Sequence, residues 1–411
     1  MIMDIIIGAG ISGLTYANYT HNDYLILEKE NHTGGLCNTI KQNGFVWDYS
    51  GHFFHFQDPQ IAEFISKRID QSQLLKVEKH TQIRYKDRLI DFPFQKNIHL
   101  LSQEEFIDCL CDLFETDNID VVSFKSMLYA KFGKSIAEKF LIPYNTKLYA
   151  TDLDNLDADA MGRFFPYANK DEIIRNFRQS HNESYNGSFL YHTGGAIEYI
   201  YALEHDIPKK KICLGEIVTS IDMERHIVHT NKRTMFYDNI ISTIPLPSLL
   251  KLCKRDYDSK VLTWNKVLVF NLGFDGKGVD CSNHWIYFPE EKYCFYRVGF
   301  YSNIIPSDKM SLYVEIGFKS DAEIDVEGML YQTLSGLREA QILHGEKLIS
   351  WHFVVMNPAY VHVSKLGINE VKNQKEALAK HNIFTIGRYG SWNYSSIEDN
   401  MKEAIALAKQ M

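Results

Sequence analysis

The first thirty residues alternate between short apolar runs and polar turns. Met3 to Ile7 is an apolar run that ends at a glycine, which is the pattern of a buried strand. A glycine-rich turn and a short helix to about Asn18 are expected next, and Tyr24 to Leu27 form a second apolar run closed by Glu28. The order of strand, turn, helix and strand predicts the opening unit of an α/β domain.

The middle of the chain divides into a helical block and a sheet block. Residues 61–180 read as mostly helical, with capping boxes that begin at Ser102 and Ser135. Residues 212–242 read as strands. Residues 261–318 read the same way, because Val, Phe and Tyr stand there at near-alternating positions.

The end of the chain returns to the pattern of its beginning. A last apolar strand, Ile383 to Ile386, leads into a closing helix from about Ile397. We therefore predict an α/β fold with a Rossmann-like cofactor domain built from discontinuous segments, a helical insert and a mainly antiparallel β-sheet substrate domain. The predicted segments are 1–75, 185–250 and 380–411 for the cofactor domain, 76–184 for the helical cap on the substrate side, and 251–379 for the substrate sheet.

Composition narrows the class of protein. The 411 residues are 45% hydrophobic and 23% charged, which excludes disordered and fibrous proteins. A net charge of −8 without a basic patch argues against a nucleic-acid partner. We expect no transmembrane segment, no signal peptide and a cytoplasmic location. The seven cysteines form no C-x-x-C pair, so we expect reduced thiols and no metal site.

Three glycines after the first strand suit a dinucleotide. In Gly8-x-Gly10-x-x-Gly13 the first glycine permits a tight turn, the second admits a pyrophosphate, and the third lets the helix pack on the strand. Glu28 lies 20 residues after Gly8 (28 − 8), where a carboxylate would hold a ribose hydroxyl. The alternative is an ordinary glycine-rich turn followed by a solvated glutamate.

A second glycine pair, Gly34-Gly35, follows Glu28, and from here the chain resembles the flavin amine-oxidase superfamily. The C-terminal stretch from Ile383 to Met411 resembles that superfamily's second FAD contact, and "GEIVTSI" resembles its adenine-side segment. The resemblance implies FAD as the cofactor. The implied FAD contacts are Gly8, Gly10, Ser12, Gly13, Glu28, Lys29, Gly34, Gly35, Leu36, Val218, Gly387, Arg388, Asp399, Asn400 and Met401.

Within that superfamily the chain resembles the UDP-galactopyranose mutases, especially the eukaryotic type. Five separated stretches, which begin at Gly34, Phe92, Phe140, His284 and Tyr360, carry the resemblance over most of the chain. It implies conversion of UDP-galactopyranose to UDP-galactofuranose, with reduced FAD as the covalent nucleophile, for cell-surface polysaccharide or lipopolysaccharide biosynthesis. A UDP-sugar is the implied partner and NAD(P)H the candidate reductant, and a homo-oligomer is a further candidate assembly.

The same resemblance gives roles to individual side chains. Arg297, Tyr360 and Tyr394 would stabilise a departing diphosphate, and His52 would position or tune the flavin. An arginine suits that task because its planar guanidinium binds phosphate oxygens with a rigid fork. The implied substrate contacts are Phe92, Gln95, Phe140, Asn145, Tyr149 and Tyr287.

Several positions depart from the family pattern. Leu190 stands where the family carries a second diphosphate arginine, and Arg175 and Arg178 are the nearest upstream replacements. These changes leave the expected FAD site intact and bear on the substrate. The other departures are Ser50 in place of a glycine, Phe92 in place of a tyrosine and Tyr149 in place of a tryptophan.

Other interpretations stay open at this point. The aromatic residues could be ordinary core, His52 a structural histidine and Arg297 part of a surface ion pair. An FAD-dependent oxidoreductase of the amine-oxidase or protoporphyrinogen-oxidase type would show net electron transfer, and Leu190 favours it. A flavin-binding structural subunit would lack a substrate pocket, and the retained tyrosine and arginine positions speak against it.

Overall fold

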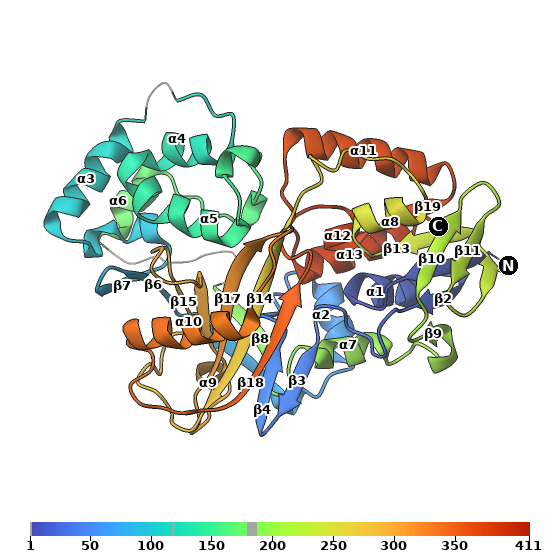
Figure 1. Cartoon of the computed structure of the whole chain (residues 1–411), viewed down its shortest axis with the longest axis horizontal. Coiled ribbons are helices and arrows are strands. Elements are labelled where there is room, and N and C mark those ends of the chain that lie inside the picture. Colours follow the sequence, from blue (N-terminus) through green and yellow to red (C-terminus); the bar gives the residue numbers. More distant parts are fainter. Residues whose placement is uncertain (1, 117–118, 179–186) are drawn as a thin grey trace.

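A five-stranded parallel sheet occupies the right-hand side of the molecule in Figure 1. The computed structural model describes residues 2–116, 119–178 and 187–411. Within them the strand order is β19-β13-β1-β2-β9, so three distant parts of the chain meet in one sheet. Its strands are β1 (Met3–Ile7), β2 (Asp23–Leu27), β9 (Ile212–Cys213), β13 (Asn239–Ser242) and β19 (Ile383–Thr385).

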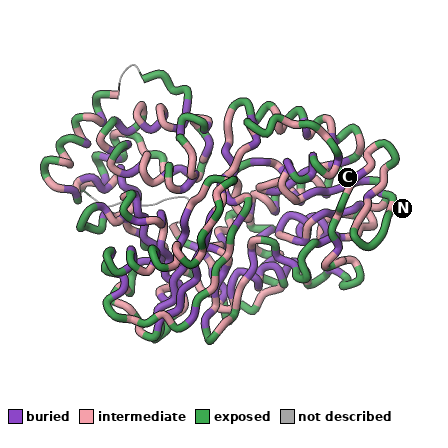
Figure 2. The backbone as a smooth tube through the Cα atoms, in the orientation of Figure 1, coloured by how far each residue is buried: buried purple, intermediate pink, exposed green. Residues whose placement is uncertain are grey.

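Both faces of this sheet are covered, which explains three consecutive buried isoleucines in β1. Ile6 packs in one core and Ile5 and Ile7 in another, because neighbouring strand residues point to opposite faces. Figure 2 shows the buried backbone running through this region. The first core takes α1 (Ile11–Tyr19), α2 (Pro59–Ser66), α7 (Ile197–Glu204) and α13 (Ile397–Ala408). The second takes α8 (Leu246–Leu252), α11 (Lys365–Ala379), β10 (Val218–Asp222), β11 (Ile227–Thr230) and β12 (Thr234–Phe236).

A seven-stranded sheet in the order β18-β14-β17-β16-β15-β6-β7 forms the middle of the molecule. Its pairings are antiparallel except for the parallel pair β15–β6. Helix α10 (Val326–Glu339) packs on one face, and the hairpin β3 (Thr39–Gln42) to β4 (Phe45–Asp48) packs on the other. The remaining elements here are β14 (Asn265–Phe274), β15 (Trp285–Tyr287), β16 (Arg297–Phe300), α9 (Tyr301–Ile304), β17 (Ser311–Lys319) and β18 (Leu348–Met356).

Residues 74–91 correct the helical prediction for this part of the chain. They form β5 (Leu74–Glu78), which pairs with β8 (Ser188–His192), and the hairpin β6 (Thr81–Tyr85) to β7 (Arg88–Asp91), which extends the large sheet. Ile83 and Tyr85 are buried and the residue between them is not, which is the two-residue period of a strand. The predicted segment boundary between residues 184 and 185 lies outside the described residues.

The helical block beside this sheet starts as the sequence predicts. The Ser102 hydroxyl caps α3 (Gln103–Phe114) by accepting a hydrogen bond from the Glu105 amide. The second predicted capping box, at Ser135, is wrong: α4 (Phe124–Ile136) begins earlier, with a capping box between Ser123 and Ser126. Ser135 lies just after a kink at Gly133, whose φ is +72°, and its amide donates a hydrogen bond to Asp112. The chain continues through a π-helical turn (Ala137–Leu141), α5 (Ile142–Tyr149) and α6 (Lys170–Asn176).

Helix α5 is anchored to the large sheet. The Lys147 ammonium donates to the carbonyls of Phe288, Glu290 and Phe295 at 2.8, 2.9 and 2.6 Å. A β-carbon at Gly317 in β17 would lie 2.2 Å from the Lys147 carbonyl oxygen. The close contact between α5 and β17 therefore depends on the absence of a side chain at that position.

The predicted fold class is confirmed, because the parallel sheet is built from discontinuous segments and is accompanied by a helical insert and a largely antiparallel sheet. Among the described residues, no helix combines the length and the apolar character needed to cross a bilayer.

Candidate functional site

The turn after β1 has glycines where the backbone requires them. Gly8 has a φ of +104°, and a β-carbon on Gly13 would lie 2.0 Å from the Gly8 carbonyl oxygen. At Gly10, which caps α1, the nearest atoms to such a carbon are 3.9 Å away in Gly34 and Gly35. A phosphate can therefore approach the amino end of α1 past Gly10, where amide groups and the helix dipole favour an anion.

The Gly34–Gly35 turn lies directly against this glycine turn. The Gly34 amide donates to the Ala9 carbonyl at 2.9 Å, and both Gly34 and Gly35 have positive φ angles, +111° and +55°. Leu36 is half-buried and packs against the main hydrophobic core. The two turns thus form the two sides of one cradle.

Glu28 is fixed at the end of β2 beside the cradle. Its buried carboxylate accepts hydrogen bonds from the amides of Ala9 at 2.8 Å and Glu30 at 2.9 Å. This places a carboxylate where a ribose hydroxyl would meet it. Lys29 points away, because its side chain is 72% exposed and pairs with Glu30 at 3.4 Å.

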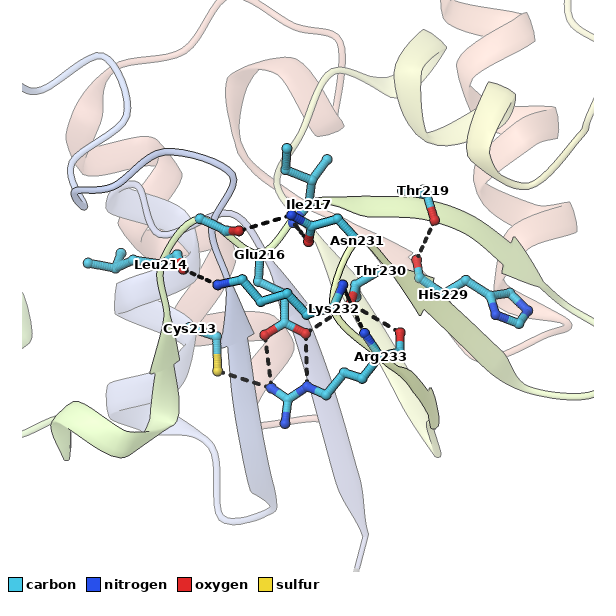
Figure 3. A network of polar contacts seen from close by, with 11 residues as sticks. Cys213, Leu214, Glu216, Ile217, Thr219, His229, Thr230, Asn231, Lys232 and Arg233 are labelled. Atoms are coloured by element: carbon cyan, nitrogen blue, oxygen red, sulfur yellow. Dashed lines mark hydrogen bonds and ion pairs between the residues drawn. The ribbon is translucent and has the colours of Figure 1, made fainter.

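Backbone contacts bring the segment before Val218 to Glu28. The Glu28 amide donates to the Cys213 carbonyl at 3.0 Å, and the Glu216 amide donates to the Glu28 carbonyl at 2.9 Å. The Glu216 carboxylate is in turn held by two nitrogens of Arg233 at 2.8 and 3.0 Å (Figure 3). This network fixes the strand start at Val218 beside the end of β2.

The C-terminal loop crosses the amino end of α1. Helix α12 (Gly387–Gly390) begins at Gly387, where φ is +82° and a β-carbon would lie 2.4 Å from the Ser12 hydroxyl oxygen. The Gly387 amide donates to a Glu403 carboxylate oxygen at 2.7 Å. Ser12 and Gly387, both predicted cofactor contacts, are therefore neighbours.

The predicted cofactor contacts in α13 have their side chains engaged elsewhere. The Asp399 carboxylate completes a capping box with Ser396 and pairs with Arg163 at 2.6 Å. The Asn400 amide oxygen accepts a hydrogen bond from Ser395, and Met401 is buried. These residues can face a flavin only through the backbone at the amino end of the helix, which favours negative charge.

The cradle fits a flavin dinucleotide. Two glycine turns, a buried carboxylate and the amino ends of two helices meet beside the parallel sheet, and the Gly10 position leaves room for a phosphate. FAD would lie with its pyrophosphate at Gly10 and its ribose at Glu28.

Arg297 forms a bidentate ion pair with a buried carboxylate. It stands opposite Glu315 across strands β16 and β17, and its guanidinium donates to both carboxylate oxygens at 2.8 and 2.7 Å. The carboxylate is fully buried and also accepts a hydrogen bond from the Ser50 hydroxyl. The alternative of a surface ion pair is therefore wrong in one respect: Arg297 forms an ion pair, but the pair is buried. It joins the strand to the loop that precedes His52.

A second cation, Arg388, lies beside two stacked tyrosines. Its guanidinium carbon is 4.7 Å from the Tyr394 ring centroid and 5.1 Å from that of Tyr360, and these two rings stack 5.8 Å apart. The buried Arg388 Nε has no hydrogen-bond partner among the described residues. Although the sequence places Arg388 with the cofactor, its side chain contacts the two predicted diphosphate tyrosines.

Asn265 joins the end of α5 to Tyr360, a role that the sequence did not reveal. Its buried side chain donates to the Leu148 carbonyl at 2.6 Å and accepts from the Tyr360 amide at 2.8 Å. This contact sets Tyr149, at the end of α5, 5.8 Å from the Tyr360 ring.

A second group of aromatic side chains surrounds Tyr287. The Phe92 ring lies 5.0 Å from the Tyr287 ring, and the Tyr287 hydroxyl accepts a hydrogen bond from the Trp285 indole at 2.7 Å. Phe140 is only 2% exposed and stacks between Phe94 and Tyr144 at 5.3 Å from each. Phe140 is therefore a core residue that packs beside this aromatic group, as the alternative interpretation of the aromatic residues expects.

Some buried polar atoms of the site have no hydrogen-bond partner in the part of the chain that the structure describes. The Gln95 side chain donates to the Pro166 carbonyl and the Asn145 side chain to the Leu141 carbonyl, so each amide is oriented. Buried polar groups almost always have a hydrogen-bond partner, so a set of unpaired ones marks a place for a ligand or water. Those without a partner among the described residues include His52 Nδ1, Gln95 Oε1, Asn145 Oδ1, Tyr149 Oη, Tyr313 Oη and Arg388 Nε.

His52 is held neutral. Burial, with the repulsion of Arg388 and Arg297, lowers its pKa to about 4, although Glu315 acts in the opposite direction. An imidazole in this state can hydrogen-bond a flavin but adds no positive charge at neutral pH.

We therefore expect His52 to contribute no titration near pH 6.5. The pH profile of turnover should keep the same shape in His52→Gln, while the rate falls through lost positioning. Steady-state rates of both proteins from pH 5.5 to 8.5 provide the measurement. An acidic limb near pH 6.5 that disappears in the variant would contradict a neutral His52.

Sequence reasoning also missed Glu315. The signal was present, because Glu315 is the single charged residue between Ser311 and Gly317 in an otherwise apolar strand pattern. A charge at such a position needs a partner, but the register that supplies Arg297 cannot be read from the sequence.

Comparisons with known proteins agree with the fold. Residues 6–68 match the NAD(P)-binding Rossmann-like domain family. Coproporphyrinogen III oxidase of Staphylococcus aureus (strain NCTC 8325 / PS 47) is 22% identical over 322 residues, 67% of this chain and 68% of that protein. The crystal structure of reduced UDP-galactopyranose mutase has a TM-score of 0.92 at 21% identity, covering 100% of this chain and 93% of the other. Cyclohexylamine oxidase from Brevibacterium oxydans IH-35A has a TM-score of 0.73 at 14% identity, covering 100% and 99%.

The resemblance inferred from the sequence is thus confirmed at the level of the fold. The chain has the fold shared by UDP-galactopyranose mutase and cyclohexylamine oxidase, and its first part has a Rossmann-like architecture.

Proposed function

We propose that the protein is an FAD-dependent enzyme that converts UDP-galactopyranose to UDP-galactofuranose. The observation that carries the proposal is the grouping of Arg297, Arg388, Tyr360 and Tyr394 beside the loop of His52. A nucleoside diphosphate has the charge and the oxygen atoms that such a group binds. We further propose a cytoplasmic reaction whose product enters cell-surface polysaccharide, with NAD(P)H as the reductant of the flavin.

The proposed reaction is redox-neutral overall. The bond between the anomeric carbon and UDP breaks and re-forms, and the ring closes through a different sugar hydroxyl, so no electrons are gained or lost. Bound FAD in its reduced form would supply a nitrogen nucleophile for the anomeric carbon.

The side chains of the site would hold the departing UDP. Arg388 and the hydroxyls of Tyr360 and Tyr394 would take up negative charge on the diphosphate as the bond breaks, and would keep UDP in place for its return. Burial raises the pKa of Tyr360 above its ordinary value, so its hydroxyl remains a proton donor at neutral pH. Gln95 and Asn145 offer oriented amide oxygens to the nucleoside.

The test uses purified flavin-loaded protein. UDP-galactose is incubated with dithionite-reduced protein, and the nucleotide sugars are separated by liquid chromatography. Formation of UDP-galactofuranose only in the reduced sample supports the proposal. A protein that binds flavin and UDP but forms no furanose is not a mutase.

One observation favours a second candidate, an FAD-dependent oxidoreductase. The Arg297 charge is already neutralised by Glu315, and Leu190 occupies the place of the family's other arginine, so the site is less cationic than two free arginines would make it. This candidate predicts oxygen uptake or dye reduction with amine or porphyrinogen substrates. Such turnover would need no prior reduction of the flavin.

A further inference from the structure

The chain just before His52 lies along one face of β17. Ser311 and Tyr313 are alternate residues of that strand, so their side chains point to the same side of the sheet. The Trp47 indole donates to the Ser311 hydroxyl at 2.8 Å. A β-carbon on Gly51 would lie 2.6 Å from the Tyr313 hydroxyl oxygen, so the chain passes directly beside this side chain. The position of the segment therefore depends on its contacts with β17.

Ser50 supplies the next contact with the same face. Glu315 lies two residues after Tyr313, and its buried carboxylate accepts a hydrogen bond from the Ser50 hydroxyl. The same carboxylate binds the Arg297 guanidinium through Nε and one terminal nitrogen. The His52 amide donates to the Ser50 carbonyl at 2.7 Å. Ser50 therefore connects His52 with Arg297 through one shared carboxylate.

The hydrogen bond from Ser50 is of the stronger kind, because its acceptor is charged. Burial would raise the Glu315 pKa, but Arg297 and the Ser50 hydroxyl hold it below its ordinary value, so the carboxylate is ionised at neutral pH. Glycine, which the family resemblance places at position 50, has no hydroxyl for such a bond. The contact is thus a consequence of this chain's own sequence at that position.

Both groups that Ser50 connects are close to the other charged and tyrosine side chains of the site. Burial raises the Tyr360 pKa, and the charge of Arg297 acts on it in the opposite direction. Burial lowers the His52 pKa to about 4, and the charges of Arg388 and Arg297 lower it further. A displacement of the loop would therefore change the distance between the imidazole and the two cations.

We propose that Ser50 is a positioning residue that fixes His52 relative to Arg297. It acts through Glu315 rather than on a ligand. Loss of the hydroxyl would free the loop, whereas the two hydrogen bonds between Arg297 and Glu315 would remain. The inference rests on the proposed function, because the reaction that it serves is the one proposed for His52 and Arg297.

Ser50→Ala tests the inference by hydrogen–deuterium exchange of the purified protein, measured by mass spectrometry. The amides of residues 51–53 are expected to exchange at least tenfold faster than in the wild type, while β14 and β17 exchange as before. In the reduced, flavin-loaded protein, kcat for UDP-galactopyranose should fall at least tenfold, and KM should stay within threefold because Glu315 still holds Arg297. Ser50→Thr keeps the hydroxyl and should restore both the slow exchange and kcat.

Ser311→Ala is the matched control. It removes the hydrogen bond from Trp47 to the same face of β17 and should leave the exchange of residues 51–53 unchanged. Equally fast exchange there in both alanine variants would mean that any lost contact with β17 loosens the segment, which would overturn the specific role of Ser50. Ser50→Gly replaces Ser50→Ala if that variant does not fold, as judged by thermal unfolding.

The remaining outcomes separate this inference from the proposed function. Unchanged exchange at residues 51–53 in Ser50→Ala contradicts the inference, and so does faster exchange throughout the chain, which indicates general destabilisation. A loosened loop with a wild-type kcat also contradicts it, because His52 would then need no fixed position. A wild-type protein that forms no UDP-galactofuranose overturns the proposed function, and the exchange comparison alone then decides whether Ser50 fixes the loop.

Discussion

Arg297→Ala is expected to cost about 3–5 kcal/mol of folding free energy, apart from any effect on a ligand. The change leaves the Glu315 carboxylate fully buried without its cation, and an uncompensated buried charge is destabilising by this amount. The loss should appear as a lower midpoint in urea unfolding at pH 7. A lower UDP affinity in the alanine variant could therefore come from lost folding stability as well as from a lost contact with the diphosphate.

The loss should also depend on pH. In the wild type Arg297 holds the Glu315 pKa below its ordinary value against the effect of burial, so this stabilisation is present at neutral pH and is lost as pH falls through that pKa. In the variant, burial alone raises the Glu315 pKa, so the penalty is present above that pKa and is relieved on protonation. The difference in unfolding free energy should therefore shrink between pH 7 and pH 4.

The matched control is the double variant Arg297→Met/Glu315→Gln. It removes both charges together and keeps similar volumes, so it should recover most of the lost stability. Its UDP affinity then measures the contribution of Arg297 to binding without a folding defect. Equal stability of the single and double variants would mean that Glu315 is not an uncompensated charge in Arg297→Ala.

Gly13→Ala is expected to remove both flavin and stability. A β-carbon there would lie 2.0 Å from the Gly8 carbonyl oxygen, so α1 has to move away from β1. Overpacking of this kind costs about 1–3 kcal/mol or more. Purified protein should show little absorbance at 450 nm and a lower unfolding midpoint than the wild type.

Gly10→Ala separates these two effects. The nearest protein atoms to its β-carbon are 3.9 Å away and its φ of −88° suits alanine, so flavin-free protein should lose less than about 1 kcal/mol. The methyl group would nevertheless occupy the approach of a pyrophosphate, and FAD affinity should fall at least tenfold in a fluorescence titration. Normal FAD affinity in Gly10→Ala would exclude this turn as the pyrophosphate site.

The parts of the site that the sequence predicts are local ones. The glycine turn and Glu28 follow from spacing within one strand–helix–strand unit, and the hydrogen bond from Ala9 to Glu28 realises that spacing. Ser102 at the start of α3 is likewise a local capping signal. Each depends on residues close together in the chain, where composition and periodicity carry information.

The parts that could not be predicted depend on strand register. Arg297 meets Glu315 because β16 and β17 pair with one alignment, and a shift by one residue would place the two side chains on opposite faces. The β6–β7 hairpin was assigned to the helical block because its partner, β15, lies about two hundred residues later in the chain. The sequence motif at Arg388 predicts a backbone contact with the cofactor. It does not predict the direction of the long side chain, which lies against Tyr360 and Tyr394.

The anchoring of α5 bears on the rigidity of the molecule around Tyr149 and Tyr287. Lys147 joins the helix to three carbonyls of the large sheet, and the absence of a side chain at Gly317 lets helix and strand touch. Tyr149 and Tyr287 stand on the two elements joined in this way. The two tyrosines should therefore keep a fixed distance from each other whether or not a ligand is bound.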